Sequence, residues 1–305
     1  GAGGTLRLLD DVTVGNPDVR STLQGVVDLW DSSRAFVVSN SATLDVYADV
    51  VGNSQLLKLG GGWMNLRGSN AHTGLTVVGA GVLDAMTPWS LGSTNAGTIV
   101  SNNATLYLSA SITNEPLTLN GYGPPGYGAL QGDARTNTWA GPVTLNADSL
   151  IYISTGGRRL DLVGVIQGPG GLTKVGTGIL RLAGNAANTY TGPTRVDAGT
   201  LELAKTVLYG AIPGDLIIGD GTGGAGADVV RLLASDQIHW RAPVTLASSG
   251  LVDLAGFEES VGSLTGSGQI TLGGGRLSIG GNNESTVYAG LIAGAGGRLT
   301  KTGTG

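Results

Sequence analysis

The chain has 305 residues, a formal net charge of −5 at pH 7, 55 glycines and no cysteine. Charged residues make up only 13% of it, and Phe and Met number two each, so its core must be built from Leu, Val, Ile and Ala. Because cysteine is absent, disulfides, thiolate metal sites and cysteine nucleophiles are excluded. The charge is too weak and scattered to indicate nucleic-acid binding, and no apolar run is long enough for membrane insertion.

The recurring element along the chain is a short alternation of aliphatic and polar residues. Successive side chains on a strand point to opposite faces, so each such segment predicts a short strand with one apolar face. Clusters of Gly, Asn, Ser and Thr separate these segments and predict tight corners. No stretch of ten or more residues indicates a helix. In chain order, the clearest predicted strands are 5–8, 43–46, 105–108, 143–145, 150–153, 200–203, 244–246 and 277–279.

One module is written twice, at 55–85 and 171–204, and begins a third time at 294–305. A single module carries one apolar stripe that it cannot bury alone, whereas stacked turns bury all the stripes in one column. We therefore predict one continuous β-solenoid over 1–305, with roughly 23 residues per turn and about 13 turns. The positions that are identical in both full copies include Lys58/Lys174, Gly60/Gly176, Gly68/Gly184, Asn70/Asn188, Thr73/Thr191, Gly74/Gly192 and Leu83/Leu201.

The second copy also carries a family resemblance. Its residues 171–204 read GLTKVGTGILRLAGNAANTYTGPTRVDAGTLELA, which resembles the autotransporter-associated β-strand repeat of bacterial surface proteins. The resemblance is specific there, fair over 55–85 and partial over 294–305. It implies a right-handed parallel β-helix with long loops, in a passenger-type protein that is extracellular or displayed on the bacterial cell surface. Members of the family differ in activity, so the resemblance implies no enzyme.

Two overlapping glycine-rich patterns follow the apolar residues 216–218. Residues 219–224 satisfy G-x-G-x-x-G, but the surrounding chain offers no βαβ unit, so a glycine-rich corner followed by a strand over 229–233 is favoured. Residues 223–231 fit one copy of the calcium-binding nonapeptide. Asp220 and Asp228 are the candidate ligands, yet one copy is short of oxygens for calcium and a plain turn is favoured. We expect no other cofactor.

Few residues are of a type that supports hydrolysis or transition-metal binding. The only adjacent acidic pairs, Asp10–Asp11 and Glu258–Glu259, are expected to be solvated loop carboxylates. There are two histidines, His72 and His239, too few for a histidine-rich metal site. His72 aligns with Tyr190 of the second module, which we interpret as an ordinary surface position.

Residues 120–138 are the one segment that breaks the pattern, and we expect them to form a loop that protrudes from the solenoid. Binding residues concentrate on loops held by rigid scaffolds. The predicted contact residues are Tyr122, Pro124, Pro125 and Tyr127. Tryptophans aligned on one face would indicate sugar binding, but Trp139 and Trp240 recur in matching sequence contexts and are interpreted as scaffold.

The two ends of the sequence together resemble one module. Leu6 and Leu8 at the start and Leu299, Lys301 and Gly303 at the end would form a junction between copies, or between this section and adjoining repeats of a longer chain. We therefore predict a structural and adhesive β-helix that forms a stalk or fibre. Surface glycans are a further expected partner, and a polysaccharide-binding or polysaccharide-cleaving β-helix is the alternative.

Overall fold

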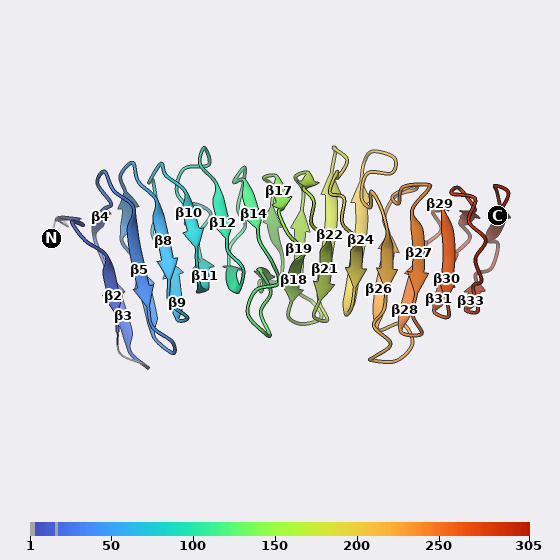
Figure 1. Cartoon of the computed structure of the whole chain (residues 1–305), viewed down its shortest axis with the longest axis horizontal. Coiled ribbons are helices and arrows are strands. Elements are labelled where there is room, and N and C mark those ends of the chain that lie inside the picture. Colours follow the sequence, from blue (N-terminus) through green and yellow to red (C-terminus); the bar gives the residue numbers. More distant parts are fainter. Residues whose placement is uncertain (1–3, 16–17) are drawn as a thin grey trace. The chain divides into compact units, whose positions relative to one another are not determined.

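The computed structural model describes residues 4–15 and 18–305 (Figure 1). All regular structure in these residues is strand, and the strands pair in parallel. The predicted all-β, right-handed parallel β-helix is confirmed, with about 13 turns. Every strand predicted from alternation is present, with ends that move by two residues at most. Within the described residues there is no helix of the length and apolar character that spans a membrane.

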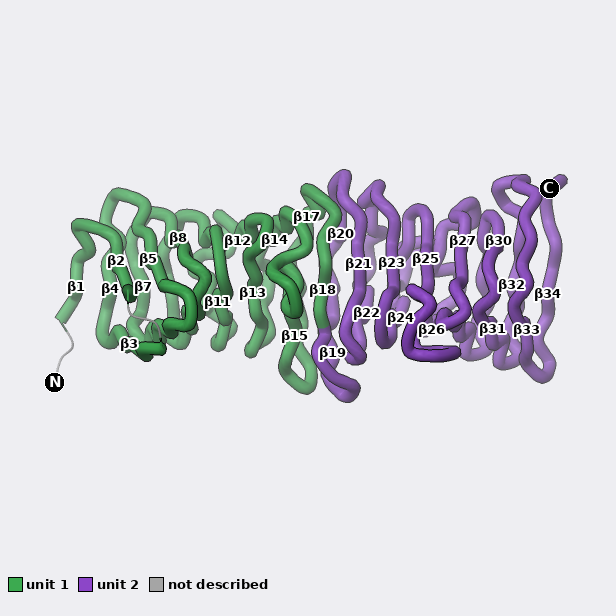
Figure 2. Tube along the Cα trace, turned by 60° about the horizontal axis from the view of Figure 1, so that its bottom comes forward, with its two compact units in different colours: residues 1–152 green, residues 153–305 purple. Residues whose placement is uncertain are grey.

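The chain divides into two compact units, residues 1–152 and 153–305 (Figure 2). Within each unit a turn of chain visits up to three sheets and returns to pair with the turn before it. Right-handed crossovers are the general rule for such parallel connections. Whether 1–305 forms one continuous solenoid stays a prediction.

Unit 1 is built on three parallel sheets, visible as adjacent arrows in Figure 1. The first holds β1 (Thr5–Arg7), β4 (Val26–Asp28) and β7 (Asp49–Val51). The second holds β2 (Val12–Val14), β5 (Arg34–Val38), β8 (Leu56–Leu59), β10 (Thr76–Val78), β12 (Thr98–Val100), β14 (Leu117–Leu119) and β17 (Val143–Leu145). The third holds β3 (Arg20–Leu23), β6 (Thr43–Val46), β9 (Trp63–Leu66), β11 (Gly81–Ala85), β13 (Ala104–Leu108), β15 (Leu130–Gly132) and β18 (Ser149–Ile153). The short β16 (Asn137–Trp139) follows β15.

Unit 2 repeats this plan. One sheet holds β21 (Leu172–Val175), β23 (Thr194–Val196), β25 (Leu216–Ile218), β27 (Pro243–Leu246) and β30 (Ser263–Gly266). A second holds β19 (Arg159–Leu162), β22 (Ile179–Gly184), β24 (Gly199–Lys205), β26 (Asp228–Leu232), β28 (Gly250–Asp253), β31 (Gln269–Thr271) and β33 (Leu291–Ala293). The third holds β29 (Glu258–Val261), β32 (Arg276–Ile279) and β34 (Arg298–Lys301), and β20 (Ile166–Gln167) precedes β21.

The core of each unit is a column of aliphatic side chains, because the pairing register places like residues on top of one another. Five inward residues of unit 2 are paired in sequence across neighbouring strands and are almost fully buried: Leu180, Leu201, Val230, Val252 and Ile270. Each such side chain contributes roughly 1.5–3 kcal/mol through burial. A charged residue at any of these positions would therefore break the column.

The repeated glycines of the two modules lie at corners that leave no room for a side chain. Gly60 and Gly176 have φ angles of 73° and 76°, a region that other residues rarely adopt. A Cβ atom at Gly60 would lie 2.2 Å from the carbonyl oxygen of Val38, and one at Gly176 would lie 2.2 Å from that of Ile153. The repeat thus preserves glycine because successive turns touch through their backbones at this corner.

Candidate functional site

The best-defined polar feature of the modules is a buried lysine near the end of β8 and of β21, whose ammonium group reaches the corner that follows the strand. Lys58 donates to the carbonyl oxygens of Leu59, Gly60 and Ala80 at 3.0, 2.7 and 2.9 Å. Lys174 makes the same three contacts at 3.2, 2.7 and 2.8 Å, with carbonyl oxygens of Val175, Gly176 and Ala198.

In both modules the third carbonyl belongs to the following turn, so this lysine links two turns. Burial lowers the pKa of Lys58 and of Lys174 to about 7. The three carbonyl oxygens in turn match the three donors of an ammonium group. Each lysine is therefore part of the scaffold and does not face solvent.

The shared asparagine serves the same purpose one corner further on. The Asn70 side-chain oxygen accepts from the Val50 N–H, and its amide nitrogen donates to the carbonyl oxygen of Ser90. Asn188 bonds in the same way to Ile166 and Ala211, at 2.9 Å each. Each asparagine therefore replaces a missing backbone hydrogen bond in the turn before it and in the turn after it.

The predicted surface position of His72 is wrong, because its side chain is fully buried. Its Nε2 atom lies 2.9 Å from the Thr76 hydroxyl, which itself donates to the Leu91 carbonyl, so Nε2 must carry the hydrogen. Burial lowers the pKa of His72 to about 4 and keeps the ring neutral. Tyr190 in the second module is buried likewise, with its hydroxyl 2.5 Å from that of Thr194. The two residues differ in chemistry but fill one structural position.

The expectation of solvated acidic pairs holds for Asp10 and Asp11, which are exposed, and fails for Glu259. Glu258 and Glu259 lie on strand β29, so alternation turns the first outward and the second into the core. The buried Glu259 carboxylate accepts from the N–H of Gln237 at 2.8 Å, and burial raises its pKa to about 8. It is a structural partner of the backbone.

The candidate calcium ligands lie near each other at one corner of unit 2. Asp220 is exposed, and its carboxylate accepts two hydrogen bonds of 2.7 Å from Thr222, which lower its pKa. Asp228 is buried at the start of β26, and both burial and the charges of Asp220 and Asp197 raise its pKa. No group of three or more His, Asp or Glu side chains suited to a metal ion occurs among the described residues. The calcium site stays a prediction, which calorimetric titration with Ca²⁺ would test.

The segment predicted as a protruding loop, 120–138, contains β15 and β16, so the loop itself spans 120–129. It folds back over the outer face of the third sheet of unit 1. The Thr105 hydroxyl donates to the carbonyl oxygen of Gly128 at 2.8 Å, and the Leu106 N–H donates to that of Ala129 at 2.9 Å. The loop is therefore fixed to the strand β13 that precedes it.

Aromatic side chains gather where this loop meets the sheet. Tyr127 packs edge-on against Trp63 with ring centroids 5.9 Å apart, and Tyr107 does so at 5.3 Å. Tyr122 is 50% exposed at the other end of the loop. We call Trp63, Tyr107, Tyr122 and Tyr127 the aromatic surface. Of the other predicted contact residues, Pro125 is exposed and Pro124 partly so, and both lie in the turn between the two tyrosines.

Sequence reasoning found the two loop tyrosines and missed Trp63 and Tyr107. Both occupy outward positions of strands, since their neighbours Met64 and Leu106 point into the core. The alternation pattern contains this information. What it lacks is the register that brings strands β9 and β13 within two strands of each other on one sheet.

The two tryptophans with matching sequence contexts have different environments. Trp139 is fully buried, as expected of a scaffold residue. Trp240 is 38% exposed, and its interpretation as scaffold stays a prediction. It lies in a turn between β26 and β27 whereas Trp139 ends strand β16, and this backbone difference explains why similar sequences place the ring differently.

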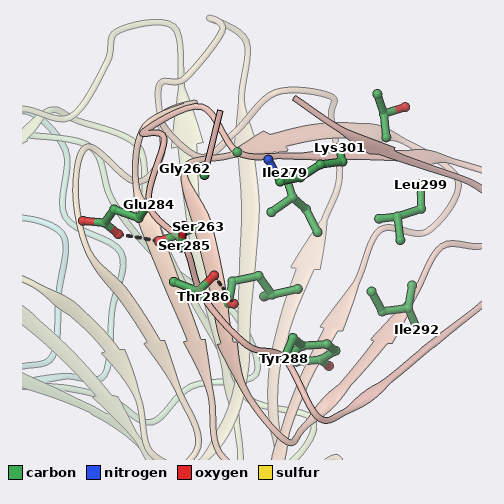
Figure 3. A pocket seen from close by; sticks show the side chains of 14 residues that line it. Gly262, Ser263, Ile279, Glu284, Ser285, Thr286, Tyr288, Ile292, Leu299 and Lys301 are labelled. Carbon is green, nitrogen blue, oxygen red and sulfur yellow. Dashed lines mark hydrogen bonds between the residues drawn. The ribbon is translucent and has the colours of Figure 1, made fainter. Parts of the chain in front are cut away.

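Of the predicted junction residues near the C-terminus, Leu299 and Lys301 line a cavity of about 370 Å³, whereas Gly303 is not one of its lining residues (Figure 3). Its apolar wall includes Ile279, Ile292 and Leu299, and Leu299 is 55% exposed. Lys301 donates to the carbonyl oxygens of Thr302 and Gly303 at 2.6 and 3.5 Å. These two contacts correspond to the first two that Lys58 and Lys174 make within their own turns.

On the N-terminal side of the predicted junction, Leu6 and Leu8 differ in exposure. Leu6 is exposed on β1, whereas Leu8 is buried and its N–H donates to the Asp28 carbonyl oxygen at 2.9 Å. The Arg34 guanidinium donates to the carbonyl oxygen of Leu8. Leu6 is thus the one of the two whose side chain is available for a contact.

Together these features define a class: a parallel β-helix repeat protein in which polar residues shared by both modules hold the turns together. The passenger-associated-transport-repeat family matches residues 56–85 and 172–203, which are the two modules. Over 233 residues, or 76% of this chain, the sequence is 30% identical to the adhesin BmaC autotransporter of Brucella suis biovar 1 (strain 1330). That match spans 5% of the adhesin's length. No solved structure matches the chain.

The chain is therefore a repeat protein of the autotransporter passenger type. The resemblance noted in the sequence is confirmed at the two places where it was strongest. The geometry adds a reason for it, since glycine, lysine and asparagine recur because each joins one turn of the solenoid to the next.

Proposed function

We propose that this chain is an adhesive, non-enzymatic section of a passenger exposed on the bacterial surface or released from it. Its similarity to part of an autotransporter adhesin supports this proposal. A further support is the nature of its buried titratable groups. The side chains of Lys58, Lys174 and Glu259 are hydrogen-bonded to backbone groups of the scaffold, and these contacts leave them unavailable to a substrate.

The observation that carries the proposal is the aromatic surface of unit 1. Tyrosine and tryptophan supply large, rigid contact areas at low entropic cost, and they are enriched at the centres of protein interfaces. Here the loop 120–129 is tied to β13, and Tyr127 is held against Trp63, so the surface is formed before any partner binds. Such preorganisation reduces the cost of association.

The proposal is tested by measuring adhesion of the purified chain to cultured epithelial cells by flow cytometry. We expect saturable binding that falls at least fivefold in Tyr122→Ala, since this exposed tyrosine is removed without disturbing the loop's backbone bonds. Tyr47→Ala is the matched control, because Tyr47 is a similarly exposed tyrosine of unit 1 outside the aromatic surface. Absence of saturable binding by the wild-type chain would contradict an adhesive function.

The alternative, a polysaccharide-cleaving β-helix, is tested on the same preparation. Release of reducing ends from polygalacturonate, xylan and peptidoglycan fragments would be measured over the pH range 5–9. We expect no release above the buffer control. Sustained turnover would replace the adhesive proposal with an enzymatic one.

We further propose that the turn formed by β33 and β34 stacks on another turn of the same kind, from a second copy or from adjoining repeats. In the two complete modules the lysine also reaches a carbonyl of the following turn, and at Lys301 such a turn would supply that third contact. It would also cover Leu299. Sedimentation velocity and electron microscopy should then reveal end-to-end assemblies that Leu299→Asp abolishes. A strictly monomeric wild-type chain at about 100 μM would contradict stacking between copies.

A further inference from the structure

A groove of about 380 Å³ lies on the outer side of unit 2. Its floor is the outer face of the small sheet β29–β32–β34, and its walls are Tyr209 and Trp240. This volume falls within the range of small-molecule sites, about 300–1,000 Å³. The repeat match ends at residue 203, so the groove lies outside both matched modules.

The walls of the groove are aromatic and held in place. Tyr209 has a φ angle of 58°, an uncommon value for a residue with a side chain, and its ring packs edge-on against His239 at 6.2 Å. His239 stacks beside Trp240 at 6.0 Å, and the Arg241 guanidinium lies over the Trp240 ring at 4.4 Å. Tyr209 and Trp240 therefore have fixed positions before a ligand arrives. Backbone strain of this kind collects at binding sites.

The floor of the groove is polar and uncharged. Ser260 and Ser278 are paired on neighbouring strands and point outward, since Glu259 and Leu277 beside them are buried. Thr302 adds a third hydroxyl, which donates to the Ile279 carbonyl oxygen at 3.2 Å. The Ser260 hydroxyl bonds to the Asp236 carboxylate, so these two hydroxyls meet a ligand through their oxygen atoms. None of the described residues that line the groove is charged. A ligand held here meets aromatic rings at the sides and hydroxyl groups below.

We propose that this groove binds a neutral carbohydrate, one or two sugar residues of a surface glycan. A pyranose ring presents C–H groups that pack on aromatic rings. Its hydroxyl groups can donate to the hydroxyl oxygens of Ser260 and Thr302 and exchange hydrogen bonds with Ser278. An apolar ligand would leave the outward Ser278 hydroxyl without a partner, and a charged ligand would lack a counter-charge among the lining residues. The inference rests on the adhesive function proposed above and names the class of ligand.

The experiment measures binding of the full chain to immobilised neutral tetrasaccharides, one each built from glucose, N-acetylglucosamine and galactose units. We expect a dissociation constant below about 1 mM for at least one of them, in keeping with a small site. Trp240→Ala should weaken binding at least tenfold, and Ser278→Val, which keeps a residue suited to a strand, about threefold or more. Trp89→Ala is the matched control, because Trp89 is a 65% exposed tryptophan of unit 1, and it should bind as the wild type does.

Three results would overturn the inference. One is the absence of binding to all three neutral probes at 10 mM, and another is equal binding by Trp240→Ala and the wild type. The third is binding confined to sialylated or sulfated oligosaccharides. Cell adhesion measured on the same samples separates the two proposals: adhesion that persists in Trp240→Ala, with no glycan bound, rejects the groove and leaves the adhesive function intact. Glycan binding by the wild type without cell adhesion would reject the adhesive function and leave the groove proposal intact.

Discussion

The two modules, 55–85 in unit 1 and 171–204 in unit 2, are two solutions to one structural problem. They agree where the backbone of one turn touches the backbone of the next, at the glycines, the buried lysine and the asparagine. They differ at His72 and Tyr190, which both reach the hydroxyl of a threonine four residues later. The comparison shows that the two modules keep the same residue where one turn touches the next. The position filled by His72 or Tyr190 lies inside a turn and requires only a large side chain that makes one hydrogen bond.

The largest effect is expected at the corner glycines. Gly60→Ala and Gly176→Ala each force a positive φ on alanine and drive its Cβ into a carbonyl oxygen, so we expect each to lower the free energy of unfolding by more than about 3 kcal/mol. Urea denaturation followed by circular dichroism measures this loss.

Matched controls for this prediction are Gly126→Ala in unit 1 and Gly224→Ala in unit 2. Both glycines have a φ of 86°, and a Cβ there would meet no atom within 4 Å. Each should cost about 1–2 kcal/mol from backbone conformation alone. If the corner and control variants lose equal stability, close contact between turns is not why the repeat keeps glycine.

The next largest effect is expected in the pH dependence of stability, which should differ between variants of His72 and Tyr190. The pKa of His72 falls from 6.5 to about 4 in the folded protein, so between these values the unfolded state binds more protons. The neutral His72 ring therefore contributes up to about 3 kcal/mol to the free energy of unfolding. This contribution is fully present above pH 6.5 and is lost on acidification towards pH 4.

Glu115 opposes this trend in the same unit, because burial raises its pKa to about 7. The measurement is therefore the difference between the wild type and His72→Gln, whose amide still donates to Thr76 and does not titrate. Their stability difference should shrink as the pH falls from 7 to 4, and Tyr190→Gln should show no such trend. A difference that is constant with pH would mean that His72 is not held neutral.

The buried lysine is expected to have a smaller effect. Lys174→Met keeps the aliphatic stem but removes the donors to three carbonyl oxygens, and it also removes the cost of burying an ammonium group. We expect a net loss of about 2 kcal/mol in urea denaturation. Lys301→Met provides the comparison, since this exposed lysine should change stability by less than about 0.5 kcal/mol. Equal losses would show that the contact with the following turn contributes nothing.

The smallest effect is expected for Tyr190→Phe. The ring still fills its buried site, and only the hydrogen bond to Thr194 is lost, so we expect about 1 kcal/mol. Tyr47→Phe, on an exposed ring, should be neutral. A loss above about 3 kcal/mol would indicate that the hydroxyl supports more than this one bond.

Much of the fold followed from the sequence, and the sites followed only in part. Alternation located the strands because the period of two is a local property of the chain. It could not reveal that Trp63 and Tyr107 share a surface with Tyr127, because that depends on register between strands. The environments of Trp139 and Trp240 were likewise beyond it, since one ends a strand and the other lies in a turn.

The sequence by itself determined that this protein is a repetitive parallel β-helix of the autotransporter passenger type. Repetition, alternation and corner glycines are all written in the order of residues, and they leave stacked turns as the way to bury the aliphatic stripes. Only the tertiary structure decided which side chains meet across turns: that His72 and Glu259 are buried, that the loop 120–129 closes on Trp63, and that Tyr209 and Trp240 flank a row of hydroxyls. The physical reason is that packing between turns joins residues some twenty positions apart, and no local pattern records which of them will touch.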